Sequence, residues 1–291
     1  GCLEVEHIAS IDASFLAKAG KRTYGLDKFW SSCLSKAKKG LEVSLLALIE
    51  VKNKRAWTLD ITQTPSGLSN KSDGINNYTR VDFYMEQLLD CLKYLEHTLY
   101  IVGDGFYAKT KVFNTVQGMG KYLITKLRPD ANMCHLLNPD EKVHGNTKYG
   151  KKVNWKTIDL TKWTYVGGHP QEKHLLIYNQ LLYHKKFGRT LNVVLIINTK
   201  TKQWVVLASS HLYQKALEIL DFYKLRFHIE FIFRDAKQFT GLHHCQARDE
   251  HKLNFHFNTS VSALNVFQLQ MVLNKDCLLY TSPSPRALAQ S

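Results

Sequence analysis

Residues 223–237 have the sequence YKLRFHIEFIFRDAK, in which charged side chains recur at helical spacing among apolar ones. At about 100° of rotation per residue, Arg226, Glu230 and Lys237 fall about −60°, −20° and −40° from Tyr223 around the helix axis. A carboxylate, two cations and a tyrosine therefore share one stripe about 60° wide. The pattern predicts a helix over residues 212–239 with a polar stripe along one side.

The residues between these charged positions indicate how the helix is packed. Because most of them are apolar, a largely buried helix is favoured over a surface helix with intrahelical ion pairs, which stays the alternative. A polar stripe on a buried helix suits a site for phosphate and metal, with Glu230 on the metal and Arg226 and Lys237 on phosphates. Tyr223 would add a hydrogen bond or a stacking contact. The apolar residues are Ile229, Phe231, Ile232 and Phe233.

The composition of the chain is that of a folded, soluble protein. Its 291 residues are 44% hydrophobic and 22% charged, which supports one large domain, or one domain with an insertion, and excludes a disordered chain. No apolar run approaches the roughly 20 residues of a membrane span, so we expect no membrane partner. The six cysteines form no Cys-x-x-Cys pair, which is typical of reduced thiols in a cytoplasmic protein. The chain begins at Gly1, and we expect it to continue a longer reading frame.

The charge of the chain points to a polyanionic partner. Lysine and arginine number 39 against 25 acidic residues, a net charge of +14. Residues 142–189 alone hold ten basic and two acidic residues, with aromatic residues between them. Basic groups follow phosphates and aromatic faces stack on bases, so this segment predicts nucleic-acid binding, with Lys151, Lys152 and Lys156 as contacts. An ordinary basic, solvated surface is the alternative.

The order of periodic segments predicts a mixed α/β core that is interrupted once. Strands, a hairpin over residues 41–64 and two helices occupy residues 1–129, with a basic loop at 18–39. Residues 130–212 lack helical periodicity and are expected to form a β-rich basic insertion, with its first strand at 152–158. Residues 213–275 return to helix and complete the core. Residues 276–291 resemble a translated sequencing adapter and are expected to be a non-native or disordered tail.

Two aspartates in the first half of the chain can join Glu230. Asp12 lies in the first predicted strand, and Asp104 follows a short apolar strand between two glycines, which allow a close approach to the backbone. Metal-dependent phosphoryl transfer requires several convergent carboxylates, because hard divalent cations prefer carboxylate oxygens. Asp60, in the predicted hairpin, competes with Asp12 for the first position, and each aspartate alone could instead cap a turn.

These motifs together resemble a known family. The pattern of Tyr223, Arg226, Glu230 and Lys237 is similar to the Tyr-x-x-Arg-x-x-x-Glu-x-x-x-x-x-x-Lys signature of DDE transposases of the bacterial insertion-sequence-four type. The segments DASF at 12–15 and DGF at 104–106 resemble the two aspartate motifs of that family. The resemblance runs from about residue 12 to 273. It departs at Phe227, where the family often has tryptophan.

The resemblance implies a fold and an activity. The expected fold class is α/β, an RNase H-like mixed-sheet core with a mostly β insertion. Asp12, Asp104 and Glu230 would be the catalytic triad and the ligands of two Mg²⁺ ions, for which Mn²⁺ substitutes. The implied activity is cut-and-paste transposition: strand cleavage, a hairpin intermediate and strand transfer.

The resemblance also implies partners and one further site residue. The expected partners are double-stranded DNA, as transposon ends and target, and a second copy of the chain in the DNA complex, in the bacterial cytoplasm. Trp204 would hold a flipped base, although a role as a core aromatic residue of a strand is equally open. Two alternatives to a transposase remain, namely an RNase H-like nuclease without strand transfer and an inactive DNA-binding remnant of a transposon.

Overall fold

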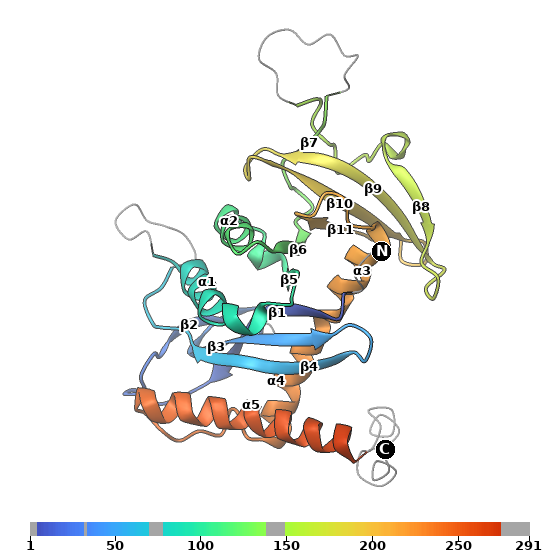
Figure 1. Cartoon of the computed structure of the whole chain (residues 1–291). Helices are drawn as coiled ribbons and strands as arrows, with labels where there is room; N and C mark the ends of the chain where they lie inside the picture. The colour runs from blue at the N-terminus through green and yellow to red at the C-terminus, as the bar shows by residue number, and fades with distance from the viewer. Residues whose placement is uncertain (1–4, 32–33, 70–77, 138–148, 275–291) are drawn as a thin grey trace.

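The first strand of the chain lies inside a mixed sheet, with an antiparallel neighbour on one side and a parallel one on the other. In the computed structural model, which describes residues 5–31, 34–69, 78–137 and 149–274, the strands form one 11-stranded sheet (Figure 1). The central strands are β1 His7–Ala17, β3 Lys36–Glu50, β4 Arg55–Gln63, β5 Tyr100–Gly103 and β6 Tyr122–Leu127. Their order is β4-β3-β1-β5-β6, antiparallel up to β1 and parallel from β1 onward. This is an RNase H-like core, so the predicted fold class is confirmed.

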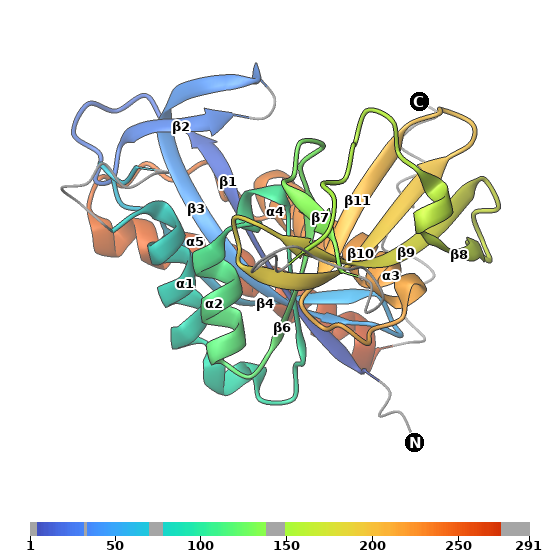
Figure 2. The same ribbon diagram turned by 90° about the horizontal axis from the view of Figure 1, so that it is seen from above.

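Helices cover both faces of this sheet (Figures 1 and 2). One face packs against α1 (Arg80–Asp90) and α2 (Thr110–Gly118). The other packs against α3 (Ala216–Leu225), α4 (Phe227–Phe239) and α5 (Glu250–Leu273). Short 3₁₀ turns occur at Leu92–Leu95, Gly105–Tyr107 and Leu160–Lys162. None of the helices in the described ranges has both the length and the apolar composition of a membrane span.

Strand β1 shows how the sequence assigns side chains to the two faces. Ile8 belongs to the hydrophobic cluster under α3, α4 and α5, whereas Ala9 and Ile11 belong to the cluster under α1 and α2. Because successive side chains of a strand point to opposite faces, Ser10 and Asp12 share the face of Ile8. Asp12 is therefore directed toward the face that α4 covers.

The single helix predicted over residues 212–239 is wrong in one respect, because the structure divides it. α3 ends at Leu225, α4 begins at Phe227, and Arg226 lies between them. α3 packs mainly on β6 and the strands of the insertion, whereas α4 packs on β1, β3 and β4. A twisted sheet presents these two regions at different angles, so one straight helix could not follow both.

Residues 130–212 extend the core sheet. β11 (Trp204–Ser209) pairs antiparallel with β6, and the other strands of the segment continue outward from it. The strand predicted over 152–158 is wrong, because that segment makes only an isolated bridge at Lys152 and the buried Trp155 anchors it by donating to the carbonyl of Ala131. The division at residues 130 and 212 stays a prediction. The remaining strands are β7 Met133–His135, β8 Thr164–Gly168, β9 Leu175–His184 and β10 Arg189–Asn198.

The basic loop predicted over residues 18–39 also differs from the structure. It contains β2 (Asp27–Ser31), which pairs with the first residues of β3. The sequence analysis missed this strand because of the three lysines at the start of β3, since a run of like charges is typical of a solvated loop.

Two of the ten basic residues counted above, Lys142 and Lys148, lie outside the described residues, as does the predicted tail.

Candidate active site at the carboxyl edge of the sheet

The two aspartates are neighbours where the parallel pairing of β1 and β5 ends. β1 and β5 pair in parallel with Ile11 opposite Gly103, so Asp12 and Asp104 follow at adjacent positions of the same sheet edge. The side chain of Asp104 accepts a hydrogen bond from the N–H of Phe106 at 2.8 Å, which starts a 3₁₀ turn and fixes the carboxylate. The parallel pairing therefore brings together two residues that lie 92 positions apart in the sequence.

Arg226 joins the first aspartate to the glutamate. Its Nη1 lies 3.3 Å from Oδ2 of Asp12, and its Nη2 donates to Oε1 of Glu230 at 2.6 Å. The guanidinium is 13% exposed and lies 5.8 Å from the ring centroid of Tyr223. The sequence predicted that Arg226 contacts phosphates, whereas the structure places it on two of the three carboxylates. Its pair with Glu230 has the i,i+4 spacing of a helix, whereas helical spacing alone does not predict its contact with Asp12.

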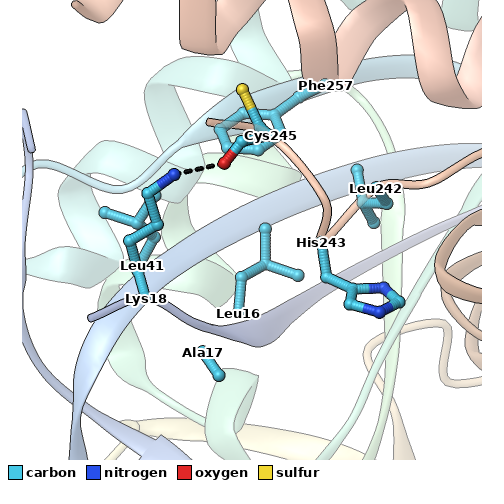
Figure 3. Close-up of a pocket in the computed structure, with 8 residues that line it drawn as sticks. All are labelled: Leu16, Ala17, Lys18, Leu41, Leu242, His243, Cys245 and Phe257. Atoms are coloured by element: carbon cyan, nitrogen blue, oxygen red, sulfur yellow. Dashed lines mark hydrogen bonds between the residues drawn. The ribbon is translucent and has the colours of Figure 1, made fainter. Parts of the chain in front are cut away.

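Lys237 lies at the same edge, farther along β1. Its Nζ donates to Oγ of Ser14 at 2.7 Å and to the carbonyl of Phe15 at 3.3 Å. A contact between the end of β1 and the loop after α4 holds this arrangement: the ammonium of Lys18 donates to the carbonyl of Cys245 (Figure 3). Leu16 and Leu242 line a small pocket beside that bond. The hydrogen bond of Lys18 thus connects the loop after α4 to the end of the strand that carries Asp12.

Burial and neighbouring negative charge raise the pKa of Asp12 from 3.8 to about 7. Burial is the largest cause, the charge of Asp104 is the second, and Glu230 contributes less. Arg226 and the N–H of Ala13 act in the opposite direction but do not compensate. Burial therefore disfavours the charged form of Asp12 more than its neighbouring carboxylates do.

The three carboxylates fit a divalent cation by their chemistry. They offer only hard oxygen ligands, which Mg²⁺ and Mn²⁺ prefer, and an added cation would offset the charge that raises the pKa of Asp12. In the part of the chain that the structure describes, no three His, Cys, Asp or Glu side chains are grouped so as to hold a metal ion. At this site, Arg226 contacts oxygens of both Asp12 and Glu230.

Removing the charge of Asp12 should stabilise the metal-free protein. The pKa of Asp12 is higher in the folded state than its ordinary value, so folding favours the protonated carboxyl. The stability that this side chain contributes is fully present below about pH 4 and is lost as the pH rises through 7. In EDTA at pH 8, Asp12→Asn should therefore be more stable by up to roughly 4 kcal/mol, and at pH 4 it should gain little. Thermal unfolding at both pH values measures this. An equal difference between the two proteins at pH 4 and pH 8 would contradict it.

Two residues beside Asp104 were missed by the sequence analysis. The Nζ of Lys109 lies 3.5 Å from the centroid of the Phe106 ring, and burial lowers the pKa of this lysine to about 8. Tyr107 is fully buried, its hydroxyl makes no hydrogen bond, and burial together with the charge of Asp12 raises its pKa. The available signal was proximity, since both residues follow the DGF motif within three positions.

The remaining predicted site residues lie farther from the carboxylates. Trp204 begins β11, which is antiparallel to β6, and so it lies at the same sheet edge as Asp104. Its ring stacks on Trp155 at 5.8 Å in the cluster under α1 and α2. Asp60 accepts a hydrogen bond from Gln87 at 2.6 Å on strand β4, two strands from β1. The structure thus brings Asp12, rather than Asp60, beside Asp104.

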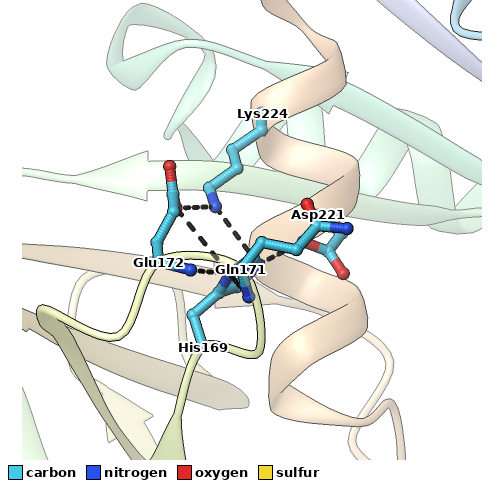
Figure 4. A network of polar contacts seen from close by, with 5 residues as sticks. All are labelled: His169, Gln171, Glu172, Asp221 and Lys224. Atoms are coloured by element: carbon cyan, nitrogen blue, oxygen red, sulfur yellow. Dashed lines mark hydrogen bonds and ion pairs between the residues drawn. The ribbon is translucent and has the colours of Figure 1, made fainter.

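The lysines predicted to bind DNA are at the surface of the insertion. Lys151, Lys152 and Lys156 are all exposed. The insertion is fixed to the helix that carries Tyr223 by a polar network (Figure 4). In it, Nδ1 of His169 accepts backbone N–H groups from the next turn, so its Nε2 donates to Asp221 at 3.1 Å. The β8–β9 turn and α3 are therefore held together.

Comparisons with known proteins give one family and several distant structures. The family model of the transposase DDE domain matches residues 83–266. Similar solved structures include endonuclease V of Ciona intestinalis with a 24-mer DNA containing an inosine followed by a ribo-adenosine (10% identity, 91% of this chain and 88% of that chain, TM-score 0.36). Another is the catalytic domain of human endonuclease V (9% identity, 92% of this chain and 86% of that chain, TM-score 0.36). A third is the NurA nuclease of Sulfolobus solfataricus (9% identity, 95% of this chain and 87% of that chain, TM-score 0.33). No curated protein matches the chain.

The matched region covers well over half of the chain. It contains Asp104, Glu230 and the rest of the signature, whereas Asp12 precedes it. The chain therefore belongs to the transposase DDE domain family.

Proposed function

We propose that this chain is the catalytic domain of a transposase of the insertion-sequence-four type, which cleaves DNA at transposon ends and joins them to target DNA. The observation that supports the proposal is the adjacency of Asp12 and Asp104 on paired parallel strands, with the charges of Asp104 and Glu230 both acting on Asp12. Arg226 connects the first and the last of them. A convergent set of carboxylates beside cations suits in-line displacement at phosphorus.

Each residue of the site has a distinct task in this proposal. Asp12, Asp104 and Glu230 bind the divalent cations that DDE transposases generally use, here two Mg²⁺ ions with Mn²⁺ as a substitute. When bound, these ions activate the attacking oxygen and stabilise the charge on the leaving oxygen. Lys237 and Arg226 hold the phosphates that flank the scissile bond, and Tyr223 orients Arg226.

Further parts of the proposal rest on the family resemblance. They are a hairpin intermediate, the holding of a flipped base by Trp204, a homodimer in the DNA complex, and action on bacterial DNA in the cytoplasm. The half-buried position of Trp204 at the site edge is compatible with a role in base binding, but its stack on Trp155 equally suits a structural role.

Two assays distinguish the proposed function from its alternatives. Nicking of a supercoiled plasmid in the presence of Mg²⁺, but not of EDTA, separates an enzyme from an inactive remnant. Joining of a precleaved transposon end to a plasmid separates a transposase from a nuclease. The transposase proposal expects both activities. Nicking without joining would favour the nuclease, and the absence of both would favour the remnant.

The basic insertion is expected to contribute a measurable part of DNA affinity. For duplex DNA, the slope of log affinity against log salt is about −0.9 for each phosphate neutralised. Replacing the exposed Lys151, Lys152 and Lys156 by alanine should therefore flatten the slope by up to about three units. Fluorescence polarisation with a labelled duplex over a salt series measures this. An unchanged slope would place the DNA elsewhere on the molecule.

A further inference from the structure

A two-stranded ribbon projects from the edge of the sheet that carries the candidate active site. We call it the basic ribbon: β2 (Asp27–Ser31) paired with residues 36–40 of β3. The pairing of β1 with β3 ends at Ala17 opposite Gly40, so residues 36–39 have β2 as their strand partner and extend beyond β1. Figure 2 shows this hairpin projecting past the rest of the sheet. Because Ala17 is the carboxyl end of β1, the basic ribbon leaves the sheet on the side of Asp12.

The two faces of the basic ribbon differ. Phe29 is fully buried on the inner face, and the guanidinium of Arg80 lies 4.5 Å from its ring centroid. The outer face consists of two directly opposed pairs, Lys28 with Lys39 and Trp30 with Ala37, and all four residues are exposed. Trp30 is 61% exposed, although tryptophan is a residue that folding usually covers.

The outer face is unfavourable for the isolated protein. Like charges placed directly opposite each other on a sheet destabilise it, which applies to Lys28 and Lys39. Among the described residues, neither lysine forms a salt bridge, and the same holds for Lys36 and Lys38. Asp27 does not compensate, because its carboxylate accepts from the N–H groups of Lys28 and Gly67. An anionic partner with flat apolar groups would offset the repulsion between Lys28 and Lys39 and would cover the exposed ring of Trp30.

The position of the basic ribbon in the sheet indicates which polyanion it meets. β2 stands at one end of the strand order and the insertion strands at the other, with β1 and β5 between them. The two basic surfaces of the chain therefore flank Asp12 and Asp104. Leu45 is the β3 partner of Asp12, and Gly40 lies five residues from it, which at about 3.4 Å per residue is about 17 Å along the strand. Asp27, opposite Gly40 on β2, is two strands from β1 and therefore lies about 20 Å from Asp12.

We propose that the basic ribbon is a second DNA-binding surface, which holds the duplex about six base pairs from the scissile phosphate on the side away from the insertion. The lysines contact phosphates, and Trp30 packs against sugar or base edges. A two-stranded ribbon fits the major groove, which admits such an element. This inference rests on the proposed function, because it takes the path of the DNA from the carboxylates.

A charge reversal tests the proposal without unfolding the ribbon. In Lys39→Glu, the new carboxylate lies opposite Lys28, so the variant should unfold at the same or a higher temperature than the wild type. Its affinity for a 40-base-pair duplex should fall roughly tenfold, and the salt slope should flatten by about two units. Trp30→Ala should weaken binding with no change of the slope. Lys52→Ala/Lys93→Ala removes two exposed lysines at the opposite edge of the sheet and is the matched control.

The outcomes separate this proposal from the proposed function. If the wild type cleaves DNA and Lys39→Glu binds with the wild-type slope, the basic ribbon is not a DNA surface, and the catalytic proposal stands. If Lys39→Glu binds DNA normally but loses binding to vesicles that contain phosphatidylserine, the ribbon faces a membrane instead. Hydroxyl-radical footprinting adds the position: protection about six base pairs from the nick should disappear in the variant. Retained protection there would overturn the proposal.

Discussion

Neutral isosteres at the three carboxylates are expected to abolish DNA cleavage. Asp12→Asn, Asp104→Asn and Glu230→Gln each keep the volume of the side chain but remove the charge that binds a divalent cation. Cleavage should fall on the order of 10³-fold or more in each variant, because stabilisation of charge at the reacting phosphorus depends on these ligands. Plasmid nicking in Mg²⁺ measures the loss, and DNA binding in EDTA should stay near the wild-type level.

Asp60→Asn is the matched control for this experiment. Asp60 lies in the same sheet, on β4, and its hydrogen bond with Gln87 is one that asparagine can also accept. This variant should cleave DNA normally. Full cleavage by any of the three site variants would remove that residue from the triad, whereas loss of cleavage by Asp60→Asn would restore Asp60 as a rival of Asp12.

Loss of either cation of the signature should impair strand transfer while metal binding persists. Arg226→Ala and Lys237→Ala should each lower the rate of joining of a precleaved end by roughly 10²-fold, the scale of losing one charge-stabilising group in a preorganised site. Arg226→Ala should also bind Mg²⁺ at least as tightly as the wild type, because the guanidinium that contacts oxygens of Asp12 and Glu230 is removed. Single-turnover joining assays and calorimetric titration with Mg²⁺ measure the two effects.

Arg234→Ala provides the control on the same helix. Arg234 is exposed on α4 and pairs with the adjacent Asp235, so it does not reach the carboxylate site. It should join DNA at the wild-type rate. Joining by Arg226→Ala and Lys237→Ala at that same rate would show that the charged stripe is structural, and the transposase proposal would then rest on the carboxylates alone.

The sequence alone was sufficient for features that depend on local pattern. Helical spacing placed Glu230 and Lys237 on one helix, where Lys237 contacts Ser14 of β1 and Glu230 contacts Arg226. The short apolar run before Asp104 predicted β5, and the hairpin of β3 and β4 followed from its β-type residues. These predictions succeed because propensity and periodicity act between residues that are close in the chain.

The tertiary structure decided everything that depends on residues far apart in the chain. Parallel pairing of β1 with β5 placed Asp12, and not Asp60, beside Asp104, and strand propensity does not distinguish the two. Packing of α4 on β1 brought Arg226 to Asp12, which is 214 residues away in the sequence, whereas its pair with Glu230 is a local i,i+4 contact. The basic ribbon became a strand pair because Phe29 is buried on its inner face under Arg80, although its lysines alone indicate a loop. Burial and long-range strand pairing outweigh local propensity at these positions, and neither can be derived from the order of residues within one segment.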